Sequence, residues 1–160
     1  MKRHLFTPNM PEQADSFPDR RDIHAGRALT AWLRLARVYQ KVDHASAERL
    51  RLWDLSVAQF DALTQIRAAE GQMQCDLAGR LLVTKGNISQ LLDRLEARGL
   101  IERRKEGRAS RLYLTAAGRA LMDEVTPGQE AFIAGQFGGL PEDELRALLA
   151  ALRRLDRALP

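Results

Sequence analysis

The spacing of apolar residues changes abruptly at Gly99, and this change limits what the chain can fold into. Before Gly99, apolar residues recur at steps of three and four, at Ile88, Leu91, Leu92 and Leu95, which predicts a helix with one buried face. After Gly99, apolar and polar residues alternate, which is typical of a half-buried β-strand. The middle of the chain is therefore predicted to be a helix followed at once by a β-hairpin.

The predicted hairpin covers the segment LIERRKEGRASRLYLT, residues 100–115, and turns near Glu106 and Gly107. Five basic side chains lie on it, outnumbering Glu102 and Glu106: Arg103, Arg104, Lys105, Arg108 and Arg111. A charged hairpin taken alone is as often a solvated turn as a binding element. Because this one follows a capped polar helix, we expect its cations to meet the phosphates or the minor groove of DNA.

The helix before the hairpin is predicted to begin after Thr84, a good N-cap, and to end at Gly99. Its polar side lies opposite the apolar face and holds Gly86, Asn87, Ser89, Gln90, Asp93 and Arg94. Lys85 adds a charge to the positive helix N-terminus, and Gly86 leaves space for a phosphate or a base. Asn and Gln side chains can form two hydrogen bonds with adenine, so Asn87 and Gln90 are the predicted base contacts.

The elements around this helix follow the order of a winged helix-turn-helix. Ser56 and Gln59 form a predicted capping box at the start of a helix that ends at Gly71, and a short helix is expected over residues 76–82. The predicted fold class is mainly α, with a two-stranded β wing and long N- and C-terminal helices.

A long first helix is predicted from Asp22 to about Leu52, either continuous or broken near His44. Its apolar residues form one stripe that we expect to be buried: Leu29, Trp32, Leu33, Ala36, Tyr39 and Val42. Residues 1–21 hold three prolines and no sustained period, and are predicted to be a flexible arm.

After the hairpin, Thr115 is predicted to cap a helix that kinks or breaks at Pro127 and Gly128. Pro141 is expected at the first position of the last helix. That helix has a leucine stripe at Leu145, Leu148, Leu149, Leu152, Leu155 and Leu159, which could join the core of the chain, pair with a second copy, or do both.

The net charge of +4 and the sequence pI of about 9.7 permit an anionic partner. No apolar run approaches the roughly 18 residues of a membrane span, and the N-terminus lacks the apolar block of a signal peptide, so we expect no membrane contact and a cytoplasmic location. The single cysteine, Cys75, excludes an internal disulfide and a Cys-rich zinc site within one chain.

The chain strongly resembles the MarR family of dimeric bacterial transcriptional regulators over about residues 25–158. The resemblance is carried by LSVAQFDAL, DLAGRLLVTKGNISQLLDRLEARGLIERR and RLYLTAAGR. The wing of the family usually carries Asp-x-Arg, and this chain has Glu106, Gly107 and Arg108 there, so the resemblance makes Arg108 the wing-tip arginine. Asp54 stands where the family commonly has Gly, which Asp tolerates because it adopts the left-handed conformation more readily than most residues.

The resemblance implies a homodimer that binds a palindromic operator of double-stranded DNA as a repressor and that a small molecule releases. After the arm (1–21), which is not a constant feature of the family, it implies a single unit (22–160), with dimerisation helices over 22–54 and 116–160 around a DNA-binding lobe over 55–115. The expected major-groove contacts are Lys85, Asn87, Ser89, Gln90 and Arg94, and the expected backbone or minor-groove contacts are Arg104, Lys105, Arg108 and Arg111. The family also implies a pocket for a phenolic or lipophilic acid, for which Trp32, Tyr39 and Phe60 are the candidate residues.

Two alternatives remain beside this interpretation. The regulator could sense oxidants through Cys75, or the winged fold and its basic hairpin could bind an acidic protein instead of DNA. An enzyme is not expected, because no nucleophile elbow, phosphate-binding Gly loop or metal-ligand cluster is present in the sequence. No cofactor is expected, and the widely spaced His4, His24 and His44 do not suggest a metal site.

Overall fold

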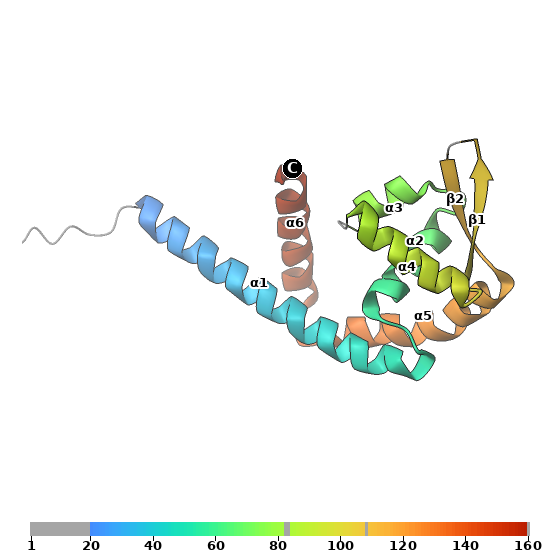
Figure 1. The fold of residues 1–160 in the computed structure, drawn as a ribbon. Helices are drawn as coiled ribbons and strands as arrows, with labels where there is room; N and C mark the ends of the chain where they lie inside the picture. The colour runs from blue at the N-terminus through green and yellow to red at the C-terminus, as the bar shows by residue number, and fades with distance from the viewer. Residues whose placement is uncertain (1–19, 82–83, 108, 160) are drawn as a thin grey trace, which may run out of the picture. The chain divides into compact units, whose positions relative to one another are not determined.

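The computed structural model describes residues 20–81, 84–107 and 109–159, and the chain divides into two compact units, residues 1–39 and 40–160. Most of the described chain is helical (Figure 1). The elements are α1 (Arg20–Leu50), the 3-10 helix η1 (Arg51–Trp53), α2 (Val57–Ala68), α3 (Gln74–Arg80), α4 (Lys85–Ala97), β1 (Ile101–Glu106), β2 (Ala109–Leu114), α5 (Ala116–Gln136) and α6 (Glu142–Ala158). No helix among these residues is long and apolar enough to cross a membrane.

Helix α1 begins at Arg20 and runs without interruption past His44, so the alternative of a break there is wrong. The segment around His44 contains neither Gly nor Pro, and Ser46 and Leu50 on its last turns are buried. The predicted arm lies outside the described residues up to residue 19, and its last two residues belong to α1.

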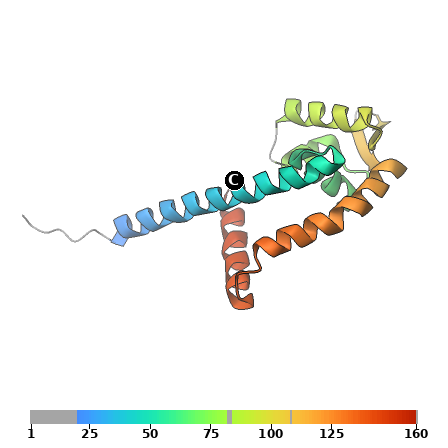
Figure 2. The ribbon, with the colours of Figure 1, turned by 90° about the horizontal axis from the view of Figure 1, so that it is seen from below.

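The core of the second unit lies where α2, α3, α4 and α5 meet the hairpin. Leu63, Ile66, Leu77, Leu92 and Leu112 are among its fully inaccessible side chains. Helix α2 contacts both α4 and α5, and Figure 2 shows it between them. The short helix α3 begins two residues earlier than the sequence predicted, because Met73 already has the extended backbone of a cap.

The local signals at the ends of these helices form as predicted. The Ser56 hydroxyl accepts a hydrogen bond from the Gln59 amide at 3.2 Å, and the Gln59 side chain accepts one from the Ser56 amide at 2.9 Å. Gly99, after α4, and Gly71, after α2, both have positive φ angles, of 67° and 80°. Asp54 adopts the left-handed conformation (φ 52°), as expected where the family has Gly.

The two strands pair in antiparallel register from Ile101 opposite Leu114 to Glu106 opposite Ala109, and form a twisted ribbon beside α4 (Figure 1). Gly107 takes the left-handed conformation in the turn, with φ at 61°. Ile101, Leu112 and Leu114 face the core, as the alternating pattern predicted.

Helix α5 begins after the predicted cap Thr115, whose hydroxyl accepts a hydrogen bond from the Gly118 amide at 3.0 Å. A Cβ atom at Gly118 would lie 2.0 Å from the Leu100 carbonyl oxygen, so α5 passes close to the start of the wing only because this residue is Gly. The helix continues through Pro127, and the alternative of a break there is wrong. Val125 and Gln129, on either side of the proline, are buried and hold the helix against the core.

Helix α6 starts at Glu142, and Pro141 is its N-cap rather than its first residue, because its ψ of 153° is not helical. None of the residues of α6 is buried in the chain, so the interpretation of the leucine stripe as part of the chain's own core is wrong. The apolar stripe of α1 was also expected to be buried, but Leu29, Trp32 and Leu33 are about 60% exposed. Among the described residues, the large apolar side chains of both stripes are therefore mostly exposed.

Candidate nucleic-acid interface

The N-terminal turns of α4 present backbone amides and polar side chains to solvent. The Thr84 hydroxyl caps the helix by accepting a hydrogen bond from the Asn87 amide at 3.3 Å. A Cβ atom at Gly86 would have nothing within 4 Å, so the first turn is open to a ligand. Asn87 and Gln90 are exposed, as expected for side chains that read bases, and so is Arg94. The described side chains of this surface are therefore available for hydrogen bonds to DNA.

Ser89, also predicted to contact DNA, is half-buried and makes contacts within the protein. Its hydroxyl accepts a hydrogen bond from Gln74 Nε2 at 2.8 Å. Gln74 is the first residue of α3, so this bond fixes the two helices of the helix-turn-helix to each other. The side chain of Lys85 lies outside the described residues.

Arg103, which sequence reasoning counted among the cations of the wing, links the wing to α4 instead. Its guanidinium lies 2.7 Å from Asp93 Oδ1 and 3.6 Å from Glu96 Oε2, and it donates to the Ser89 carbonyl at 3.3 Å. The side chain is only 21% exposed. The sequence does contain a signal for this role, because the preceding helix carries two acidic residues, Asp93 and Glu96. A count of the charges on the hairpin does not take these two residues into account.

The other described cations of the wing differ in the contacts that they make within the protein. Arg104 pairs with Glu102, and its guanidinium lies 4.3 Å from the centre of the Tyr113 ring. Arg111 pairs with Glu106 and donates to the Gly71 carbonyl at 2.7 Å, so it supports the turn before α3. Lys105 is exposed, and Arg108 lies outside the described residues.

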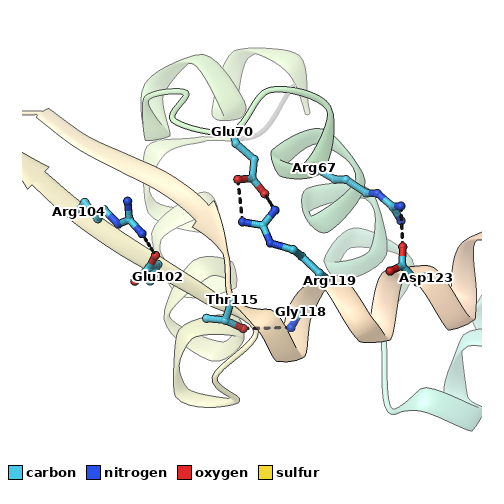
Figure 3. A network of polar contacts seen from close by, with 8 residues as sticks. All are labelled: Arg67, Glu70, Glu102, Arg104, Thr115, Gly118, Arg119 and Asp123. Atoms are coloured by element: carbon cyan, nitrogen blue, oxygen red, sulfur yellow. Dashed lines mark hydrogen bonds and ion pairs between the residues drawn. The ribbon is translucent and has the colours of Figure 1, made fainter.

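Ion pairs join α2 and the turn after it to α5, beside the base of the wing (Figure 3). Arg119, on α5, holds both carboxylate oxygens of Glu70, which follows α2, and Arg67 lies 2.7 Å from Asp123. The hydrogen bonds from Arg119 lower the pKa of Glu70 below its ordinary value. These pairs connect the end of α2 to the helix that follows the wing, so they act on the framework rather than on DNA.

A hollow of about 520 Å³ opens between α3, α4 and β2, and its lining includes Gln74, Cys75, Ile88, Ser89 and Ser110. Cys75 is exposed, and its thiol lies 3.7 Å from a carboxylate oxygen of Asp76. It is the second residue of α3, rather than a residue before the helix as the sequence suggested.

The candidate effector residues fall in both compact units. Trp32 and Tyr39, in the first unit, are 63% and 66% exposed, whereas Phe60, in the second, is partly buried against the core. The hollow beside Cys75 does not include Phe60. In the parts of the chain that the structure describes, no three His, Cys, Asp or Glu residues are grouped to hold a metal ion.

Known proteins match both the sequence and this geometry. A sequence model of the MarR family matches residues 53–112. An HTH-type transcriptional regulator of Bacillus cereus (strain ZK / E33L) is 37% identical over 121 residues, which cover 76% of this chain and 82% of the relative.

Two solved structures are similar over most of their length. A mutant of E. coli MarR in complex with operator DNA has a TM-score of 0.74 and 28% identity, covering 84% of this chain and 96% of that one. Bordetella bronchiseptica BpsR, whose DNA binding is regulated by 6-hydroxynicotinic acid, has a TM-score of 0.68 and 28% identity, covering 76% and 90%. With its capped polar helix, its braced basic wing and these relatives, the chain belongs to the MarR family of winged helix-turn-helix, DNA-binding transcriptional regulators.

Proposed function

We propose that this regulator is a homodimeric repressor that binds a palindromic operator in the cytoplasm and leaves it when a small-molecule effector binds. The observation that carries the proposal is the link from Arg103 to Asp93 and Glu96, which fixes the wing to α4. A recognition helix and a wing fixed to each other can contact the major groove and the adjacent backbone at the same time.

The dimer is proposed because two helices outside the winged lobe carry apolar faces that the chain leaves uncovered. Trp32 and Leu33 on α1 and Leu155 on α6 are each more than half exposed. Large contiguous apolar surfaces on soluble proteins usually mark interfaces. We therefore assign residues 22–54 and 116–160 to dimerisation and residues 55–115 to DNA binding, and a two-fold dimer would place two recognition helices on two half-sites.

Within each half-site we assign base recognition to Asn87 and Gln90, which are exposed on α4. Lys85 and Arg94 complete the major-groove set, and Arg104, Lys105 and Arg108 would contact the phosphates or the minor groove. Ser89 and Arg111 belong to the proposed contacts as well, but they would have to exchange bonds within the protein for bonds to DNA.

The effector is proposed to be a small phenolic or lipophilic acid, with Trp32, Tyr39 and Phe60 as contacts. The regulation of BpsR by 6-hydroxynicotinic acid, a small aromatic acid, supports this class of ligand. Binding would favour a dimer conformation in which the recognition helices no longer match the half-site spacing. Titration of the protein–operator complex with 4-hydroxybenzoic acid and decanoic acid, read by fluorescence anisotropy, tests this part of the proposal.

Oxidant sensing through Cys75 is the second candidate, because the thiol is exposed and lines a hollow that α4 also lines. Treatment with cumene hydroperoxide should then weaken operator binding in the wild type and leave Cys75→Ser unaffected. Equal affinities of the oxidised and reduced wild-type protein would remove this candidate.

The DNA-binding proposal is tested by selecting duplexes from a random library and footprinting the enriched sequence. Gln90→Ala should relax the preference at one base position, because a bidentate contact discriminates by about 1–3 kcal/mol. Arg108→Ala should weaken binding to all duplexes and reduce the slope of log Kd against log salt by about 0.9. A wild-type protein that prefers no duplex over genomic fragments at near-physiological salt contradicts sequence-specific binding.

A further inference from the structure

The connection between α1 and α2, residues 51–56, receives a side chain from the far end of the recognition helix. Arg98 caps the C-terminus of α4, and its Nη1 donates to the Asp54 carbonyl at 2.5 Å while its Nη2 donates to the Trp53 carbonyl at 3.1 Å. The Asp54 carboxylate lies 3.8 Å from the same guanidinium. Arg98 therefore holds two successive carbonyl groups of a connection that lies more than forty residues earlier in the chain.

The two carbonyl groups are available because the connection is a tight and well-anchored turn. Asp54 has left-handed backbone angles, and its amide donates to the Arg51 carbonyl at 3.0 Å. Leu50 and Leu55, on either side, are buried, and the Leu55 amide donates to the Leu50 carbonyl at 3.1 Å. The planar guanidinium offers several donors in a fixed fork, which suits a pair of neighbouring acceptors.

The same connection is also attached to α5. Trp53 Nε1 donates to Glu124 Oε1 at 2.8 Å. Two residues before the connection, Arg49 donates to the Gly128 carbonyl at 3.2 Å and lies 5.0 Å from the centre of the Phe132 ring. The end of α1, the middle of α5 and the C-terminus of α4 thus meet at one short segment.

We infer that Arg98 is a positioning residue for DNA binding, which sets the direction of α4 relative to α1 and α5 without contacting DNA itself. Helix α4 has 13 residues and is about 20 Å long. A tilt of about 5° at its Arg98 end would move the end near Thr84 by about 2 Å, which is enough to break a hydrogen bond of ordinary length. Asn87 and Gln90 would then miss their bases although neither residue had changed.

The consequence concerns the distance between half-sites, and in this respect the inference rests on the proposed palindromic dimer. If α1 and α5 fix the two protomers to each other, the Arg98 contact transmits that geometry to each recognition helix. Without the Arg98 contact, each recognition helix remains packed in its lobe, but its direction relative to α1 and α5 varies more. The protein would then tolerate operators whose half-sites are moved by one base pair.

The test compares Arg98→Ala and Arg98→Lys with Arg51→Ala, which removes one charge from the same connection but leaves the two carbonyl contacts intact. Affinity is measured by fluorescence anisotropy on the duplex selected by the wild type and on versions with one base pair inserted or removed between half-sites. We expect Arg98→Ala to weaken binding to the selected duplex about tenfold and to reduce the discrimination against altered spacing at least threefold. Arg98→Lys, which keeps one donor group, should fall between it and the wild type.

The salt dependence separates positioning from contact. A lost phosphate contact reduces the slope of log Kd against log salt by about 0.9, whereas loss of a positioning residue leaves that slope unchanged. A reduced slope in Arg98→Ala, or affinity and spacing discrimination within twofold of the wild type, would overturn the inference. Equal effects of Arg51→Ala and Arg98→Ala would overturn it as well.

A measurement without DNA keeps the inference testable if the proposed function fails. The chain has two tryptophans, so Trp32→Phe leaves Trp53, in the connection itself, as the only one. In that background Arg98→Ala should increase acrylamide quenching of Trp53 fluorescence about twofold, and the thermal unfolding curve should show that the lobe remains folded. Unchanged quenching means that Arg98 does not hold the connection, whereas a wild type without duplex preference contradicts only the proposed operator.

Discussion

The winged lobe and the apolar stripes of α1 and α6 have the same helical period, but the large apolar side chains of the lobe are buried, whereas those of the two stripes are largely exposed. Leu63, Leu92 and Leu95 in the lobe are completely inaccessible, whereas Trp32 on α1 and Leu155 on α6 are 63% and 57% exposed. A period of 3.6 shows that one side of a helix is apolar, and it does not show what covers that side. The lobe has its own core, and the terminal helices carry surfaces suited to a partner.

The largest effect is expected from a substitution in the core of the lobe. Leu92→Ala should lower the free energy of unfolding by about 2–5 kcal/mol, because a fully buried leucine leaves a cavity in a packed interior. Urea unfolding followed by circular dichroism measures the loss. Leu155→Ala is the matched substitution on a terminal helix, and an equal loss in the two variants at a concentration where both are monomeric would contradict the contrast.

A smaller effect is expected on the association of two chains, and it tests the exposed leucine stripe of α6. Leu155→Asp places a charge on the apolar face of α6 and should raise the concentration of half-dissociation at least tenfold, which corresponds to about 1.4 kcal/mol. Sedimentation velocity over a concentration series measures it. Ala150→Asp adds the same charge to an exposed position on another side of the helix and should change the dissociation constant less than twofold. A monomeric wild type would show that the stripe has a different partner.

The smallest expected effect concerns the ion pair between Glu70 and Arg119, which joins the end of α2 to α5. The pKa of Glu70 is lower in the folded chain than in the unfolded chain, so the Arg119 pair stabilises the fold above the ordinary carboxyl pKa and loses this effect as the pH falls through the folded value. Glu70→Gln should therefore lower the free energy of unfolding by less than about 1 kcal/mol at pH 7, since such pairs lie near the surface. In urea unfolding, the difference between the two proteins should shrink as the pH falls through the lowered pKa of Glu70 in the folded chain. A difference that does not shrink with falling pH would have another cause than ionisation.

The sequence predicted the elements of the lobe well, because their signals are local. The caps at Ser56, Thr84 and Thr115, the glycines at turns and the alternating hairpin all depend on residues a few positions apart. The expectations that failed were a break at His44, a break at Pro127, the exact place of Pro141, the start of α3 and the leucine stripe as part of the core. At the first two positions the helix is held by packing against distant residues, which overrides a weak local preference.

For the candidate site, the sequence identified the exposed polar residues of α4 but did not separate cations that face solvent from cations that hold the framework. Arg103 and Arg111 look like Arg104 and Lys105 in a count of charges, yet both make contacts inside the protein. Arg98 received no role from the sequence, although it makes two hydrogen bonds to backbone carbonyl groups. The identity of a charged residue gives its sign, and only its neighbours decide what it binds.

The sequence by itself determined the type and order of the elements, their ends, and the polar character of the surface offered by α4, because hydrogen bonds between near neighbours and apolar periodicity fix these properties. The tertiary structure decided which apolar faces the chain covers and which cations tie the wing, α4 and the α1–α2 connection together. Those choices depend on contacts such as that between Arg98 and Asp54, 44 positions apart, and they exist only once the chain has folded.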